Sequence, residues 1–148
     1  MNSHSVQVVF DGIDDLVDTL VELSRKYPDR ASELLQADAK ILRKDVVSRI
    51  KKDAETKKQS KRSLRKAGSY KISQPRDFGC MQYIEISATS PHFHLVEHGH
   101  NKTNRKGEVI GFVEGRRYMA DAVEEFEDNI EYHVISMIDA LLKEGDLI

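Results

Sequence analysis

Four of the six histidines lie within nine residues, in the segment HFHLVEHGH at positions 92–100. His94 and His98 are four residues apart, so on a helix they would share one face, with Glu97 beside them. Zinc enzymes use this histidine spacing in the H-E-x-x-H motif, where the catalytic glutamate follows the first histidine. Here the glutamate instead precedes the second histidine, so the order of the motif is not reproduced.

The residues that flank the cluster also argue against a metal site. Pro91 precedes the segment and Gly99 ends it, which disfavours a rigid helix. On a strand, only His92 and His94 would share a face, whereas a catalytic zinc site needs about three protein ligands. We therefore favour a polar corner over a metal centre, and predict no metal and no cofactor. The apolar anchor of this corner would consist of Phe93, Leu95 and Val96.

Other catalytic patterns are also missing from the sequence. There is no G-x-S-x-G nucleophile motif. The stretch GHNKTNRKG at 99–107 lacks the G-K-[ST] ending of a phosphate-binding loop. Cys80, in an apolar run, resembles a small buried hydrophobic residue more than an activated thiol. The sequence therefore predicts a protein that is not an enzyme, and a small metal-dependent enzyme using His94, Glu97 and His98 remains an alternative hypothesis.

Charge is distributed unevenly along the chain. The formal net charge is −2, but residues 40–66 hold twelve Lys and Arg against three Asp and Glu, a net charge of +9. Residues 108–146 hold three Lys and Arg against eleven Asp and Glu, a net charge of −8. Opposite charges of this size can pair within a subunit or between copies, and the basic part can also contact nucleic acid.

The basic charge is densest in residues 55–69, which we interpret as an exposed, mobile basic loop. No aromatic side chain for base stacking occurs in the loop before Tyr70, and no known DNA-reading motif frames it. Solvation or contact with an acidic partner is the favoured interpretation, and a nucleic-acid-binding module is the alternative. The candidate contact residues are Lys57, Lys58, Lys61, Arg62, Arg65 and Lys66.

These segments must be positioned by an α+β fold. The apolar spacing predicts a first helix that ends at Pro28, a second helix from about Arg30 to about Asp53, and a long C-terminal helix from Arg117 or Tyr118 to Gly145. Strands are predicted at 6–10, 70–73, 80–89 and 108–115, with a turn at 74–79. We therefore expect N-terminal helices and a long C-terminal helix packed on a small antiparallel sheet.

Length and composition fit a single domain over residues 1–148. No apolar run approaches the roughly 18 residues of a membrane span, so no membrane contact is expected. The N-terminal residues lack the basic start and apolar stretch of a secretory signal. The single cysteine cannot form an internal disulfide, which suggests a reducing cytosol.

Three stretches in this order resemble a known family. They are VVFDGIDDLVDTL at 8–20, SKRSLRKAGSYKI at 60–72, and the run from Pro91 to Glu127. The last run carries a corner motif, made of Leu95, Val96, Glu97, His98, Gly99 and His100, and a helix-start motif, made of Gly115, Arg116, Tyr118 and Met119. Together they are similar to the tail-component family of tailed bacteriophages, typified by gene product ten of the Hong Kong ninety-seven phage. Members often have a proline and a phenylalanine where Arg117 and Tyr118 stand.

The resemblance implies a non-enzymatic structural protein at the head–tail junction or the tail terminus of a tailed phage or prophage. It implies a homo-oligomeric ring, possibly a hexamer, that contacts head-connector or other tail proteins. DNA would cross the lumen, where the basic loop could contact it. The expected location is the neck or tail of the virion, and the cytoplasm of the bacterial host during assembly.

Overall fold

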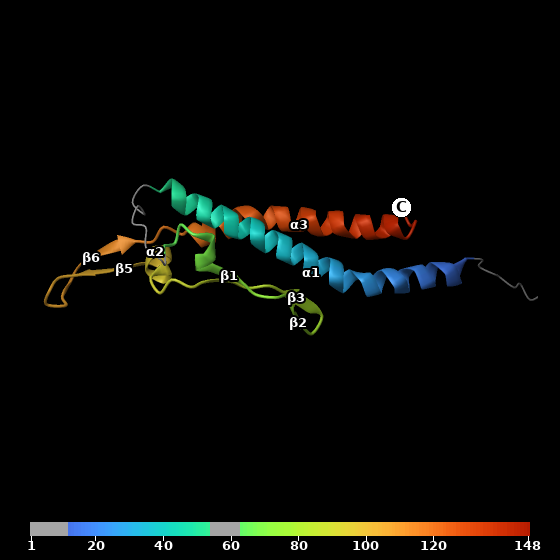
Figure 1. The fold of residues 1–148 in the computed structure, drawn as a ribbon, viewed down its shortest axis with the longest axis horizontal. Coiled ribbons are helices and arrows are strands. Elements are labelled where there is room, and N and C mark those ends of the chain that lie inside the picture. Colours follow the sequence, from blue (N-terminus) through green and yellow to red (C-terminus); the bar gives the residue numbers. More distant parts are fainter. Residues whose placement is uncertain (1–11, 54–62) are drawn as a thin grey trace, which may run out of the picture.

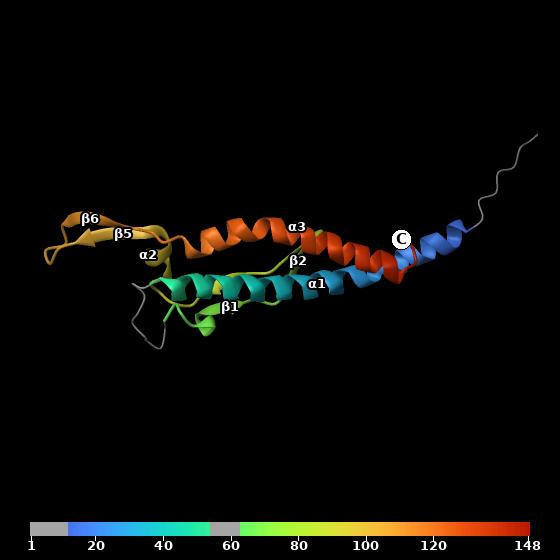
Figure 2. The same ribbon diagram turned by 90° about the horizontal axis from the view of Figure 1, so that it is seen from above.

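The computed structural model describes residues 12–53 and 63–148, and it shows the α+β class that the sequence predicts (Figure 1). Two long helices lie side by side and antiparallel, α1 (Ile13–Lys52) and α3 (Tyr118–Glu144) (Figures 1 and 2). At 1.5 Å per residue, the 40 residues of α1 extend over about 60 Å. The result is an elongated molecule with small β-hairpins along one side and at one end.

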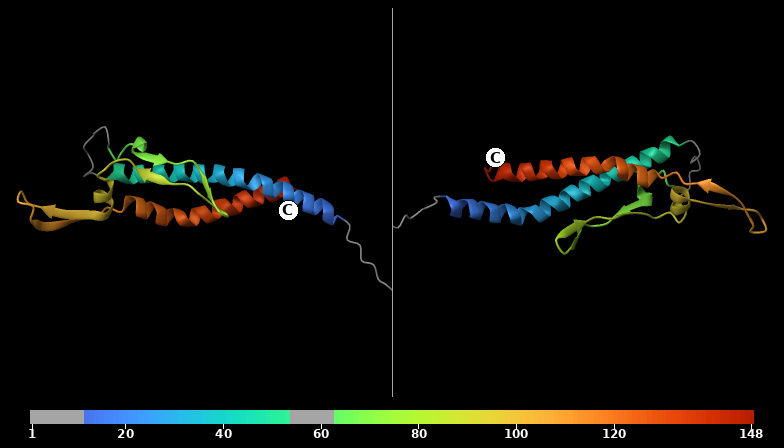
Figure 3. Two further views of the ribbon diagram at one scale, coloured as in Figure 1. Left: turned by 90° about the horizontal axis from the view of Figure 1, so that it is seen from below. Right: turned by 180° about the vertical axis from the view of Figure 1, so that it is seen from behind.

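The prediction of two N-terminal helices separated at Pro28 is wrong, because α1 is continuous through Pro28. A proline inside a helix removes one backbone hydrogen bond and favours a kink. Figure 3 shows that α1 is bent along its length. Contacts with α3 on both sides of the proline offset this cost. Leu23 is 8 % exposed beside Gly145, and Arg30 Nη2 lies 2.6 Å from Glu144 Oε1.

The next segment forms one long, interrupted hairpin. Strand β1 (Tyr70–Ile72) pairs antiparallel with β4 (Ile86–Ala88), and β2 (Arg76–Phe78) pairs antiparallel with β3 (Met81–Tyr83). The turn predicted at 74–79 therefore contains a strand, and the strand predicted at 80–89 is divided in two. The break lies beside Pro75, which has no N–H to donate to a ladder.

A second hairpin extends beyond the helices and consists of β5 (Gly99–Thr103) and β6 (Val109–Glu114). It follows the short helix α2 (Phe93–His98). The described residues thus hold three separate two-stranded sheets, whereas one small sheet was expected. The strand predicted at 6–10 lies outside the described residues.

The core is small and lies at one end of the helix pair. The C-terminal half of α1, the start of α3, the paired strands β1 and β4, and α2 meet there. Tyr70 is 1 % exposed and packs edge to face on Phe93, with 5.9 Å between ring centroids. The other buried side chains of this cluster come from α1 and the start of α3: Val46, Val47, Ile50, Tyr118 and Ala122.

Candidate functional site

The corner motif and the helix-start motif, which are separated in the sequence by residues 101–114, meet in space. Glu97 is 4 % exposed, and its Oε1 accepts hydrogen bonds from the backbone N–H groups of Met119 (3.0 Å) and Ala120 (2.8 Å). These are unpaired amides of the first turn of α3. The N-cap residue of α3, Arg117, has a left-handed backbone (φ 51°) and makes no capping bond with its own side chain. Glu97 therefore caps α3 from another element, where the helix dipole also favours its negative charge.

This arrangement explains how the chain begins α3 without a proline at position 117. Proline fixes φ near −65°, which is incompatible with the φ of +51° at Arg117. The cap is supplied instead by the Glu97 carboxylate and by the backbone, since Arg117 N donates to the Glu97 carbonyl at 3.2 Å.

Two glycines allow the backbones to approach at this corner. A Cβ on Gly115 would lie 2.2 Å from the Glu97 carbonyl oxygen, and a Cβ on Gly99 would lie 2.4 Å from the Val113 carbonyl oxygen. Gly99 also has φ +83°, a conformation that favours glycine. We call the group Glu97, Gly99, Gly115, Met119 and Ala120 the braced corner. It fixes the direction in which the β5–β6 hairpin leaves the molecule.

A second polar contact ties α1 to the same corner. Tyr118, 8 % exposed, donates a hydrogen bond from its hydroxyl to Asp53 Oδ2, and Asp53 is the C-cap of α1. Arg116 Nε lies 3.8 Å from the same carboxylate oxygen. Nearby, burial raises the pKa of Tyr70, and the negative charge of Glu97 raises it further. The corner is therefore closely packed and polar, and its groups are used to hold three helices together.

The histidines do not form a metal centre with Glu97. Although Pro91 and Gly99 were expected to disfavour a rigid helix, α2 is helical from Phe93 to His98, and Gly99 ends it. His94 and His98 lie on its exposed side, while the Glu97 carboxylate is buried against α3. Across residues 12–53 and 63–148, no group of three or more His, Cys, Asp and Glu side chains could hold a metal ion.

The basic loop is only partly described. Lys57, Lys58, Lys61 and Arg62 lie outside the described residues. The two ends of the described remainder, residues 63–69, are packed, because Ser63 and Ser69 are buried and Ser69 Oγ donates to the Ser63 carbonyl at 2.7 Å. Arg65 Nη2 donates to the Lys51 carbonyl at the end of α1 (3.1 Å), and Lys66 is exposed.

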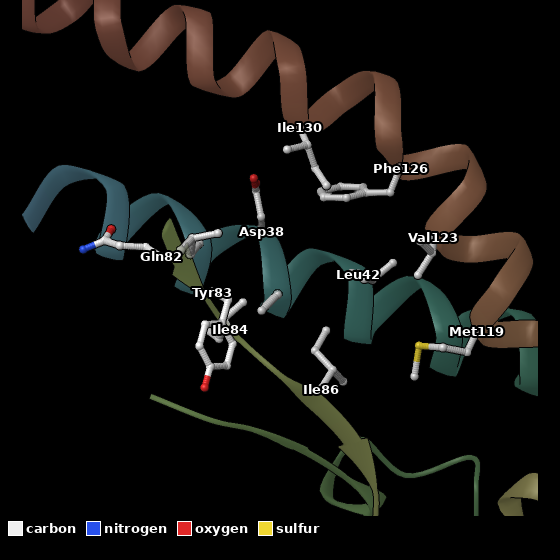
Figure 4. A pocket seen from close by; sticks show the side chains of 12 residues that line it. Asp38, Leu42, Gln82, Tyr83, Ile84, Ile86, Met119, Val123, Phe126 and Ile130 are labelled. Atoms are coloured by element: carbon white, nitrogen blue, oxygen red, sulfur yellow. The ribbon is translucent and has the colours of Figure 1, made fainter. Parts of the chain in front are cut away.

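The sequence did not reveal an open apolar groove of about 450 Å³ between α1, α3 and the β3–β4 segment (Figure 4). Its size lies within the roughly 300–1,000 Å³ typical of binding sites. At one edge, Asp38 (7 % exposed) lies 2.7 Å from His133 Nδ1 and links the two helices. The apolar lining residues are Leu35, Ala39, Leu42, Ile84, Ile86, Met119, Val123, Phe126 and Ile130. The apolar spacing that predicts the helices and strands signals that these positions face the interior, but it does not reveal that part of this surface stays uncovered.

The β5–β6 hairpin carries the second uncovered surface, and we call residues 99–114 the arm. Val109, Ile110 and Phe112 are 62 %, 58 % and 62 % exposed. The turn of the arm is ordered by Asn104, whose Oδ1 accepts hydrogen bonds from the N–H groups of Lys106 and Glu108. Large apolar side chains on a well-formed hairpin are typical of an interaction surface.

The described elements contain no helix that is both long and apolar enough to span a bilayer. No family model matches the chain, and no curated protein or solved structure matches it either.

Proposed function

We propose that this chain is a non-enzymatic structural protein of a tailed phage or prophage, acting at the head–tail junction or tail terminus as an oligomeric ring. The observation that carries the proposal is the arm, an ordered hairpin that exposes Val109, Ile110 and Phe112 at the end of an elongated molecule. Surfaces of this kind in a folded protein are sites of association. The resemblance of the corner and helix-start motifs to the tail-component family supplies the biological setting.

The positions of the exposed surfaces support a ring. The arm lies at one end of the long axis, while the apolar groove lies alongside the helices (Figures 1 and 4). Two different surfaces of one subunit produce a head-to-tail contact, and such contacts close into rings when the rotation per subunit allows it. The basic residues at 57–66 would then contact DNA or a neighbouring virion protein.

The proposal is tested on virions and on the purified chain. Mass spectrometry of purified particles from a phage that encodes the chain should detect it in each particle, and deletion of its gene should leave heads and tails unjoined or tails unfinished. Negative-stain images of the purified chain should show rings. Normal infectious particles that lack the chain would contradict the proposal. The position of the gene between those for the capsid and the major tail protein would support it.

A further inference from the structure

We infer that the arm of one copy docks in the apolar groove of the next copy. The inference rests on the proposed function, since a second copy of the chain is the partner. It adds which surfaces meet and which residues hold them. The arm is uncovered, the groove is open, and the charges around them are complementary.

The arm gains little burial from its own chain. Its base is held at the braced corner, but β6 exposes Val109, Ile110 and Val113 by 62 %, 58 % and 42 %. The arm projects away from the helices in every view (Figures 1, 2 and 3). Its apolar side chains can therefore be buried only by another molecule.

The groove cannot be filled by the arm of the same copy. The groove runs along Leu35–Leu42 of α1 and Met119–Ile130 of α3, whereas the arm leaves the N-terminal end of α3, before Tyr118, and points away from the helices (Figure 1). The braced corner fixes this direction, because a turn of the arm toward the groove would break the contact between Gly115 and the Glu97 carbonyl. The contact must therefore join two copies through different surfaces.

The charges around the two surfaces are opposite. The outer half of the arm carries Lys102, Arg105 and Lys106 against Glu108, so three positive charges and one negative charge give a net charge of +2. The three basic side chains are exposed, and none has an ion-pair partner among the described residues. Glu127 lies one helical turn after the lining residue Val123, and Glu131 lies one turn after Glu127. Both glutamates are exposed, and within residues 12–53 and 63–148 neither has an ion-pair partner. They place an acidic rim beside the groove, which would attract the basic arm and set its orientation.

The test uses two variants that disable opposite surfaces. The arm variant is Val109→Asp with Ile110→Asp, which leaves Phe112 in place against Gly99. The groove variant is Val123→Lys with Ile130→Lys, two partly exposed positions. Masses are measured by light scattering after size-exclusion chromatography, for each variant alone and for a 1:1 mixture.

We expect the wild type to form oligomers and each variant alone to stay near the 16.9 kDa subunit mass. The mixture should form a dimer of twice that mass, because the intact arm of the groove variant can dock in the intact groove of the arm variant. No further copy can then add. A control matched to the arm variant, Tyr132→Asp with Ile135→Asp, places the same two negative charges on exposed apolar residues of α3. It should assemble like the wild type.

A second measurement does not depend on the folding of the groove variant. In a Cys80→Ser background, Ile110→Cys with Ile130→Cys should form disulfides between copies on mild oxidation and give a ladder of oligomers. Either single cysteine should give at most a dimer.

Three results would overturn the inference. Wild-type oligomers that survive in both variants would show that the ring uses other surfaces, which leaves the proposed function standing. A mixture that stays monomeric would exclude arm-to-groove docking. A wild type that is monomeric at all concentrations, but joins particles, would assign the groove or the arm to another virion protein. Absence from particles, by contrast, would refute the proposed function and not the docking.

Discussion

The braced corner holds the base of the hairpin that forms the arm, yet the packing of the two regions differs sharply. At the corner, Glu97 is 4 % exposed and a Cβ on Gly115 would overlap the backbone. Farther along β6, Val109 is 62 % exposed. A rigid base with an uncovered end loses little freedom on binding, and this is the property that an element contacting another molecule needs. The difference indicates that the corner serves the stability of one copy, and under the proposed docking the arm serves association.

The largest expected effect is at the corner, in Gly99→Ala. The new Cβ would meet the Val113 carbonyl oxygen at 2.4 Å, and alanine would have to adopt φ +83°. Strain and overpacking together should cost about 3 kcal/mol or more in the free energy of unfolding. Chemical denaturation of dilute protein measures this value.

Gly107→Ala is the matched control, because Gly107 also has φ +83° but nothing lies within 4 Å of its Cβ position. It should lose only the conformational part, about 1–2 kcal/mol. Equal losses at the two positions would show that the close backbone approach at the corner contributes nothing.

The next effect is the loss of the α3 cap in Glu97→Ala. The N–H groups of Met119 and Ala120 would lose their acceptor in a buried place, which should cost about 2–3 kcal/mol. Glu97→Gln keeps an acceptor oxygen and should lose less. Thermal denaturation ranks the two variants. Equal stability of Glu97→Ala and the wild type would show that the Glu97 cap does not stabilise the fold.

A smaller effect should appear at alkaline pH through Tyr70. Burial raises its pKa, so the folded state keeps the phenol neutral at a pH where unfolded tyrosine, with a pKa near 10, ionises. Its contribution to stability is therefore complete below about pH 10 and falls above it, by up to about 1.4 kcal/mol per pH unit.

Tyr70→Phe should abolish this dependence. It should cost about 1 kcal/mol at neutral pH, because the hydroxyl no longer donates to the Leu64 carbonyl. The difference in unfolding free energy between wild type and variant should shrink as the pH rises from 9 to about 11. A constant difference would contradict the burial argument.

The smallest effect on the stability of a single copy should come from the arm. Val109→Ser with Ile110→Ser changes exposed positions and should shift the unfolding free energy by at most about 0.5 kcal/mol at concentrations where the chain is monomeric. An arm variant that lost as much stability as Glu97→Ala would contradict the conclusion that the corner, and not the arm, stabilises a single copy.

Much of the fold follows from apolar periodicity. The predicted start of α3 near Tyr118 and its end at Gly145 are confirmed, because the stripe and the glycine stop are local signals. The predictions of strands β1 and β6 are confirmed as well, because runs of strand-forming residues are also local signals. The break predicted at Pro28 is wrong, because contacts between α1 and α3 outweigh the local preference of one proline.

The site was only partly predictable. The sequence singled out the segments around Glu97 and Gly115, but the capping of α3 by Glu97 depends on a contact between residues more than twenty positions apart. Apolar spacing likewise predicted the C-terminal helix that carries Val123 and Ile130, yet the spacing does not reveal whether its own chain or another copy covers these side chains. For the same reason the groove and the arm could not be predicted.

The most direct test of the account is hydrogen exchange followed by mass spectrometry at rising protein concentration. If the arm of one copy docks in the groove of the next, amides of the arm (99–114) and of the groove helices (35–42 and 119–130) should become protected as copies associate, while the core segment 46–50 should change little. If the exchange of each segment stays unchanged as the concentration rises, and the mass remains at 16.9 kDa, the result would contradict the claim that one copy covers the open surfaces of another.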